Sequence, residues 1–432
     1  MPDRILTGPI RSRPGRVVFS SYRRTFEAPG TVPFALAGLL ARFPMGMAGV
    51  AAVFMITGWR HSYSLAGSLA ATVLVVVAVA GPQISRLVDR YGQARVAVPA
   101  VLVSTAGSLG ELLCLRFGGP DWLLFGTAAV SGLGPNIGTM SRARWSALYQ
   151  GNEEVLHSAY ALEAVIDEIC FIVGPLAATA LATGLFPSAG FVAAGVVMLL
   201  GTVLFCAQRR TEPRIRRTER ARSGSALRSP GLRILVLTLL ATGGVFGINE
   251  ITVIGFADHL GHKAAASLVL ACYALGSCLA GLAFGLWKPK GAATTRLPLF
   301  LLLMTALLAL LPLVGSLPVL AAVLFAAGLC TAPTMVTSMG LVRDCVPPEK
   351  LNEGFGWAVT GLLLGVSGGA AVGGWAVQHL GAGAGFRIPA AMSGLALLIA
   401  LLGRRGLAAR PTGAARPDAE PSEATGPVSQ VQ

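Results

Sequence analysis

The sequence predicts an all-α integral membrane protein with twelve transmembrane helices in two six-helix bundles. Three observations support this fold class. Of the 432 residues, 54% are hydrophobic and only 12% are charged, and the mean hydropathy is +0.68. A soluble protein carries about 25% charged residues, so this composition excludes a soluble enzyme, a nucleic-acid module and a disordered protein. The apolar runs are also long enough to cross a bilayer, and the cations are unevenly distributed between the connecting segments.

Twelve apolar runs are close to the ~20 residues that a helix needs to cross the hydrocarbon core. They lie at residues 32–58, 64–86, 96–117, 121–142, 158–184, 187–208, 232–256, 264–287, 296–315, 317–342, 353–379 and 382–403. A basic linker at 209–231 divides the chain into an N-terminal bundle at 32–208 and a C-terminal bundle at 232–403. The tails at 1–31 and 404–432 complete the chain, and the polar, Pro-rich C-terminal tail is expected to be disordered.

The positions of the cations predict the orientation. With the N-terminus inside, 29 of the 34 Lys and Arg residues fall on the cytoplasmic side, including Arg142 and Arg144 at the cytoplasmic end of the fourth span. Trp145 lies at the same span end, where indole rings prefer the membrane interface. Because cytoplasmic loops collect Lys and Arg, the pattern predicts a multi-pass protein of the cell's inner membrane with both termini in the cytoplasm. The net charge of +14 therefore requires no nucleic-acid partner.

The loop after the second span reads GPQISRLVDRYGQAR, at residues 81–95. It resembles the signature between helices 2 and 3 of the major facilitator superfamily, G-x-x-x-D-R-x-G-x-R-R. Asp89, Arg90 and Gly92 match this signature, and Arg95 lies one position beyond its last basic residue. The resemblance implies alternating access around a midplane cavity, with Asp89 helping to close the cytoplasmic side. Asp89 and Arg90 are expected to form charge-assisted hydrogen bonds to the other bundle, and an ordinary basic turn is the alternative.

Two further patterns concern the direction of transport. SGLGPNIG at 131–138 resembles part of an antiporter signature, with Ala128 at the place of its arginine. Gly174 and Pro175 resemble the Gly-Pro of the drug–proton antiporter signature. These resemblances favour export of a small amphipathic compound coupled to a proton gradient, as in an antiporter. The missing arginine keeps proton-coupled uptake as the alternative, and a non-transporting receptor or scaffold is a further one.

Ionisable residues inside the spans are the first candidates for a functional site, because a charge at the bilayer centre costs roughly 2.5–3.5 kcal/mol on insertion scales. Arg42 lies near the middle of the first span, and the fifth span carries Glu163, Asp167 and Glu168. Glu163 and Asp167 are four residues apart and share a helix face. We expect Arg42 to pair with these acids and at least one carboxylate to carry a proton, since neighbouring carboxylates do not ionise together easily. A static ion pair that only neutralises Arg42 is the alternative.

Other residues are weaker candidates. Asn136 on the fourth span is expected to face a cavity. Asn249 and Glu250 on the seventh span are expected either to face a cavity or gate or simply to lie near the membrane interface. Four-residue spacing of glycines predicts close helix packing in the eleventh span, at Gly365, Gly369 and Gly373. The sequence contains no P-loop, no HExxH and no metal-ligand pattern, so we expect no enzyme, no cofactor and no metal. The expected partners are a small-molecule substrate, protons and membrane lipid, and the expected state is a monomer.

Overall fold

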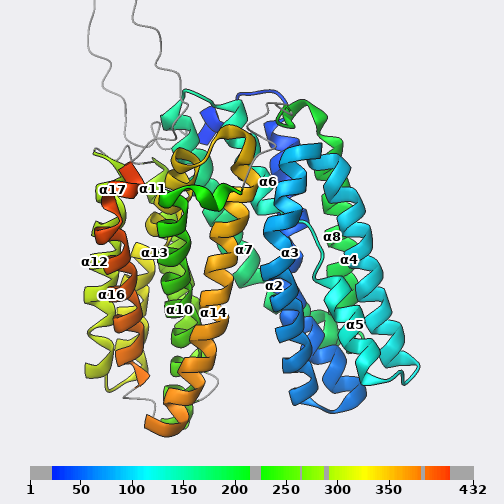
Figure 1. The fold of residues 1–432 in the computed structure, drawn as a ribbon. Helices are drawn as coiled ribbons and strands as arrows, with labels where there is room; N and C mark the ends of the chain where they lie inside the picture. The colour runs from blue at the N-terminus through cyan, green and yellow to red at the C-terminus, as the bar shows by residue number, and fades with distance from the viewer. Residues whose placement is uncertain (1–21, 215–224, 263–264, 287–290, 381–384, 409–432) are drawn as a thin grey trace, which may run out of the picture.

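The computed structural model describes residues 22–214, 225–262, 265–286, 291–380 and 385–408. Within these ranges the regular secondary structure is entirely helical (Figure 1). The N-terminal bundle contains α2 (Thr31–Arg60), α3 (Tyr63–Tyr91), α4 (Gln93–Arg116), α5 (Asp121–Ser131), α6 (Ile137–Leu148), α7 (Glu153–Gly184) and α8 (Ala189–Ala207). The C-terminal bundle contains α10 (Pro230–His259), α11 (Ala265–Leu286), α12 (Ala293–Leu308), α13 (Leu317–Cys345), α14 (Leu351–Leu380) and α16 (Arg387–Leu402).

These helices occupy the twelve positions that the apolar runs predict. Ten helices of the described ranges are long and apolar enough to cross a membrane. The fourth predicted span is divided into α5 and α6, and the twelfth is the 16-residue α16. The predicted all-α membrane fold is therefore confirmed. A short helix, α17 (Arg404–Ala408), continues past the predicted end of the second bundle, and the tail from 409 onward lies outside the described residues.

The prediction of one continuous helix over 121–142 is wrong. Gly132, Gly134 and Pro135 interrupt it, because glycine weakens a helix and proline lacks a backbone N–H. Asn136 then caps α6, since its Oδ1 accepts a hydrogen bond of 3.1 Å from the backbone N–H of Thr139. The polar candidate Asn136 thus has a structural role in starting a new helix inside the bundle.

This break moves three side chains away from their predicted places. α6 extends to Leu148, so Arg142 and Arg144 lie inside a helix and are 7% and 0% exposed. Trp145 is fully buried, so its ring packs inside the protein and does not face lipid. The expectation that the two arginines lie at the end of the fourth span, among the cytoplasmic cations, is therefore wrong about their burial.

Glycines permit the closest helix contacts. On α14, a methyl group at Gly365 or Gly369 would overlap a carbonyl oxygen of α10, and Gly373 faces Ile248 of the same helix. Gly174 of α7 has the same relation to α2, where a methyl group would lie 2.7 Å from the carbonyl carbon of Gly46. Such flat glycine surfaces let two helix backbones approach each other.

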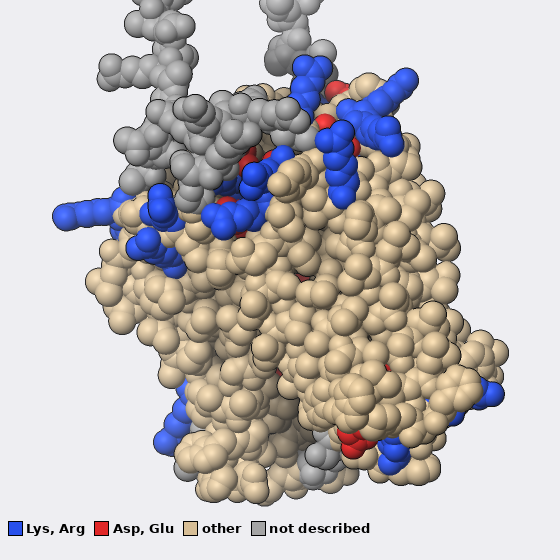
Figure 2. Space-filling view, turned by 45° about the vertical axis from the view of Figure 1, so that its right-hand side comes forward, with Lys and Arg blue, Asp and Glu red and all other residues tan. Residues whose placement is uncertain are grey.

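One end of the molecule carries the linker. We call this end the linker face; it comprises the linker residues 209–214 and 225–229 and the helix ends beside them. Both described chain ends lie on this side in Figure 1. Figure 2 shows that most visible Lys and Arg side chains also gather at this end, while the broad middle of the surface is free of them. An uncharged middle band is the surface that a protein presents to lipid hydrocarbon.

Candidate functional site

Four charged side chains meet inside the N-terminal bundle, between α2, α6 and α7. Arg42 Nη1 lies 2.7 Å from Glu163 Oε2 and 2.9 Å from Asp167 Oδ1. Arg142 Nη2 lies 2.6 Å from Asp167 Oδ2. We call these four residues the buried charge cluster. Two cations and two anions neutralise one another, which offsets the cost of removing them from water.

Glu163 is the fixed member of the cluster. Its side chain is fully buried. Its Oε1 accepts hydrogen bonds of 2.7 Å from Ser141 Oγ and 2.7 Å from the indole Nε1 of Trp145. With these partners in addition to Arg42, Glu163 is suited to hold the cluster in place.

Asp167 is the accessible member of the cluster. Its side chain is 22% exposed, against 3% for Arg42 and 9% for Arg142. Each carboxylate oxygen faces a different arginine, so Asp167 joins α2 to α6 through charge-assisted hydrogen bonds. A ligand or water that reaches the cluster from the bundle interior would meet Asp167 first.

The helix break gives the second arginine its position. Gly138 lies in the first turn of α6, and a methyl group there would lie 3.1 Å from Arg142 Nη1 and 3.5 Å from Arg42 Cδ. A side chain at this position would therefore crowd the guanidinium groups. Sequence reasoning missed Arg142 as a site residue. The Gly-Leu-Gly-Pro-Asn segment at 132–136 could have indicated a helix break, and therefore a new helix that contains Arg142.

Glu168 lies outside the cluster although it follows Asp167 directly. Its Oε1 accepts a hydrogen bond of 2.6 Å from Ser277 Oγ on α11 of the other bundle. Among the described residues no cation forms an ion pair with Glu168. The structure therefore divides the three acids in the middle of α7 between an ion-paired cluster and the interface of the two bundles.

The candidates on the seventh span do not join this site. Asn249 of α10 is 2% exposed, and its amide atoms have no hydrogen-bond partner. Glu250 is exposed on the same helix. Neither forms a hydrogen bond or ion pair with the buried charge cluster in the described structure.

Asp89 connects the two bundles at the linker face. Its Oδ1 accepts hydrogen bonds from the backbone N–H of Asn352, at 3.1 Å, and from Asn352 Nδ2, at 2.7 Å. Its Oδ2 accepts one of 2.8 Å from the backbone N–H of Glu353. Asp89 thus caps the first turn of α14 from the other bundle, where a carboxylate is favoured by the unpaired N–H groups and the helix dipole.

The neighbouring arginine does not take part as expected. Arg90 is exposed and lies over the ring of Tyr91, with 5.2 Å from its guanidinium carbon to the ring centre. Arg86 reaches the other bundle instead, with its Nε 3.6 Å from Glu353 Oε2. The expectation that Arg90 binds the opposite bundle is therefore wrong. It failed because Arg86 precedes Asp89 by three residues and shares its helix face.

The remaining signature residues shape the turn. Gly92 has a φ of 96°, in a region that favours glycine, and it joins α3 to α4. Arg95 is exposed in the first turn of α4. Gly92 therefore makes a tight connection between the two helices at the linker face.

Further hydrogen bonds close the same face between α7 and α11. A ring nitrogen of His157, Nε2, lies 2.7 Å from the carbonyl oxygen of Phe284. Ser158 Oγ donates to the carbonyl oxygen of Gly285, also at 2.7 Å. With the contacts of Asp89, these hydrogen bonds hold the two bundles together at the linker face.

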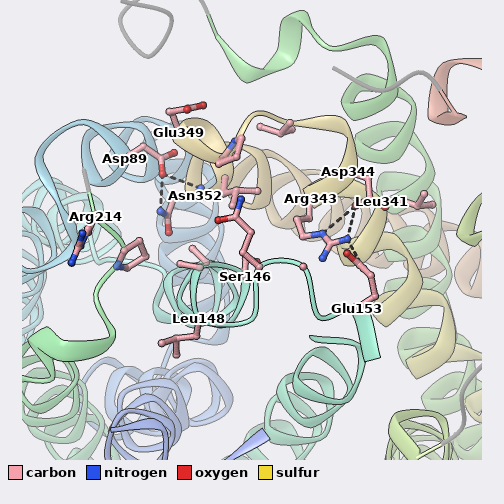
Figure 3. Close-up of a pocket in the computed structure, with 18 of the residues that line it drawn as sticks. Asp89, Ser146, Leu148, Glu153, Arg214, Leu341, Arg343, Asp344, Glu349 and Asn352 are labelled. Carbon is pink, nitrogen blue, oxygen red and sulfur yellow. Dashed lines mark hydrogen bonds and ion pairs between the residues drawn. The ribbon is translucent and has the colours of Figure 1, made fainter. Parts of the chain in front are cut away.

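A cavity of about 1100 Å³ lies at this face, between the two bundles and the start of the linker. Figure 3 shows Asp89 with Asn352 at one side of it and Arg343 with Glu153 and Asp344 at the other. Arg343 Nη2 lies 2.7 Å from Glu153 Oε2 and 2.7 Å from Asp344 Oδ1. Pairs of opposite charge therefore border the cavity on the side where the bundles meet.

Comparison with known proteins decides the family. A sequence model of the Major Facilitator Superfamily matches residues 34–260 and 235–429, once over each bundle. The chain belongs to the major facilitator superfamily. A search of curated proteins finds no match. Family and fold together identify a membrane transporter and not an enzyme.

Solved structures show the same fold. A bacterial homologue of the iron transporter ferroportin, in the outward-facing state, aligns with a TM-score of 0.67 at 15% identity, over 87% of this chain and 98% of that one. The E. coli fucose:proton symporter FucP aligns with a TM-score of 0.67 at 12% identity, over 87% and 99%. A human organic anion transporter aligns with a TM-score of 0.65 at 18% identity, over 90% and 100%. At these identities the likeness concerns the fold alone.

Proposed function

We propose that this transporter exports a small amphipathic molecule across the cell's inner membrane in exchange for protons. In this proposal it works as a monomer by alternating access, and the linker face lies in the cytoplasm. The cation distribution supports this orientation. The resemblance of Gly174 and Pro175 to the drug–proton antiporter signature supports export.

Glu168 is the proposed proton carrier, and its contacts are the observation that carries the proposal. In the buried charge cluster, Glu163 and Asp167 are neutralised by two arginines. Glu168 is partly buried and has a hydroxyl group, but no described cation, as its partner. A carboxylate in such surroundings gains most from binding a proton, because burial disfavours its charged form.

Competition at Glu168 would couple the proton to the substrate. An ionised Glu168 attracts a cationic or hydrogen-bond-donating group of a substrate, and a protonated Glu168 does not. Binding of one would then release the other, which is what exchange requires. Because Ser277 belongs to the other bundle, a change at Glu168 also acts directly on the interface that moves.

The closed linker face fits an outward-facing state in this proposal. The contacts of Asp89 with Asn352 and of Ser158 with Gly285 would have to break before the cytoplasmic side opens. Opening therefore requires binding energy from the substrate or from the proton.

Uptake together with protons is the second candidate. The observation that favours it is Ala128, which is fully buried in α5 at the place where the antiporter signature has its arginine. The two candidates differ in the sign of coupling. A proton-exchanging exporter moves its substrate in the direction opposite to the protons. A symporter moves its substrate in the same direction as the protons.

Reconstitution tests the proposal. Purified protein in liposomes receives an imposed pH gradient and a panel of cationic, neutral and anionic compounds, with insertion checked by proteolysis of the linker. Movement of a compound against the proton flux supports exchange. Movement with the proton flux supports uptake instead. A complete absence of flux in correctly inserted protein would contradict both transport proposals and support the receptor or scaffold alternative.

A further inference from the structure

A second, smaller cavity lies at the linker face where α7 meets α11, α12 and α13. Its volume is about 250 Å³. Its lining includes His157 of α7, Gly285 of α11, Arg296 of α12 and Thr337 of α13. Both bundles therefore contribute walls to this pocket, which we call the α12 pocket. A water molecule occupies about 30 Å³ in the liquid, so the pocket has room for a polyatomic ion.

Two polar side chains in the α12 pocket lack partners. The Nε and Nη1 atoms of Arg296 are buried and form no hydrogen bond. Thr337 is 4% exposed, and its Oγ1 also has no partner. Buried polar groups are nearly always hydrogen-bonded, so a buried group without a partner indicates a role such as ligand binding. Arg296 is half-buried as a residue, and two of its guanidinium nitrogens are removed from water without a hydrogen-bond partner, which is costly.

The other charges of the pocket have partners of their own. Arg343 pairs with Glu153 and Asp344 at 2.7 Å each. Glu154 also lines the pocket and lies 3.4 Å from Arg24, which does not line it. None of these acids forms an ion pair with Arg296 in the described structure. Arg296 is therefore the cation of the pocket whose charge remains uncompensated.

We propose that the α12 pocket binds a phosphate group. Arginine is the side chain best suited to phosphate, because its planar guanidinium group offers several N–H donors in a fixed fork. Thr337 supplies a hydroxyl donor from the facing helix. Cationic side chains between transmembrane helices bind phospholipid headgroups, and a free phosphate ion presents the same chemistry to Arg296. The proposed ligand group is therefore a phosphate, and the experiment below distinguishes a lipid headgroup from a free phosphate ion.

A ligand in this pocket would stabilise the closed linker face. The pocket borders the hydrogen bonds of His157 with Phe284 and of Ser158 with Gly285, which join the bundles. A phosphate group held by Arg296 and Thr337 on one bundle and lying against α7 of the other would add to these contacts. The inference is independent of the proposed proton exchange, because it involves neither Glu168 nor the buried charge cluster.

The test measures thermal unfolding of the purified full chain. One arm adds inorganic phosphate in detergent, with potassium chloride at equal ionic strength as the reference. The other arm compares nanodiscs of phosphatidylglycerol with nanodiscs of phosphatidylcholine. Variants Arg296→Gln and Thr337→Val remove the two unpartnered groups. Arg228→Gln is the matched control, because it removes an exposed cation from the same face outside the pocket.

We expect the anion to raise the unfolding midpoint of the wild type by several degrees, in line with stabilisation by a ligand that binds only the folded state. Arg296→Gln should abolish this shift, Thr337→Val should reduce it, and Arg228→Gln should retain it. A shift with inorganic phosphate indicates a free-ion site, whereas a shift only with phosphatidylglycerol indicates a lipid headgroup. Equal shifts in Arg296→Gln and the wild type, or no shift in either arm, would overturn the inference. A separate flux assay tests the proton exchange, so the two proposals can fail independently.

Discussion

Asp89 of α3 accepts two hydrogen bonds from Asn352 of α14 and a third from the next backbone N–H, so that one carboxylate caps a helix of the opposite bundle. This relationship makes the turn after α3 a direct connection between the two bundles. It also explains why an acid, and not another polar residue, occupies this position. A hydrogen bond to a charged group contributes about 1.5–3 kcal/mol, and the start of α14 offers several donors at once.

Asp89→Asn should weaken closure of the linker face. The amide keeps the size of the side chain but loses the charge and one acceptor, so part of the capping energy is lost. We expect hydrogen exchange in the first turn of α14, at residues 351–355, to become at least tenfold faster. Arg90→Gln is the matched control, because Arg90 lies over Tyr91 and away from α14. Equal acceleration in both variants would contradict the assignment of the contact to Asp89.

Glu163 and Asp167 should respond differently to neutralisation. Glu163→Gln leaves Arg42 without its fully buried partner and weakens the contact with Trp145, and breaking a buried pair costs about 3–5 kcal/mol. Asp167→Asn affects a partly exposed acid, so we expect a smaller loss of stability. Thermal unfolding in detergent, followed by tryptophan fluorescence, compares the two. A larger loss in Asp167→Asn would show that Asp167, and not Glu163, anchors the cluster.

The contact between α10 and α14 should depend on individual glycines. In Gly369→Ala the added methyl group would overlap the carbonyl oxygen of Gly244, so the helices must separate. Overpacking of this kind costs about 1–3 kcal/mol. Gly368→Ala is the control, since a methyl group there meets no atom within 4 Å. Unfolding midpoints of the two variants measure the difference, and equal midpoints would argue against close packing at this position.

Most of the fold follows from the sequence because a membrane leaves few options. Each crossing segment must satisfy its own backbone hydrogen bonds and present apolar side chains to lipid, so long apolar runs predict helices directly. The site is predicted less completely. The contact of Arg42 with Glu163 and Asp167 is present, since a mid-membrane charge needs a nearby partner of opposite sign.

The residues that the sequence did not place correctly have three different causes. Arg142, Arg144 and Trp145 were placed at a membrane boundary because hydropathy assumes a straight, uninterrupted span. The proline-containing break at 132–136 starts a new helix and carries these residues into the interior. Arg86 was overlooked because the family signature directs attention to Arg90. The contacts of Asn352 and Ser277 depend on how the two bundles pack against each other, and no local sequence pattern predicts this packing.

The most direct test of the account is proton-driven flux of Glu168→Gln in liposomes, once the compound panel has identified a substrate. Glu250→Gln is the matched control, because Glu250 is exposed on α10 and forms no described contact with the site. We predict that Glu168→Gln reduces the flux driven by a pH gradient at least tenfold and retains exchange of labelled for unlabelled substrate. Glu250→Gln should retain both activities. Undiminished, pH-dependent flux in Glu168→Gln would contradict the assignment of Glu168 as the proton carrier.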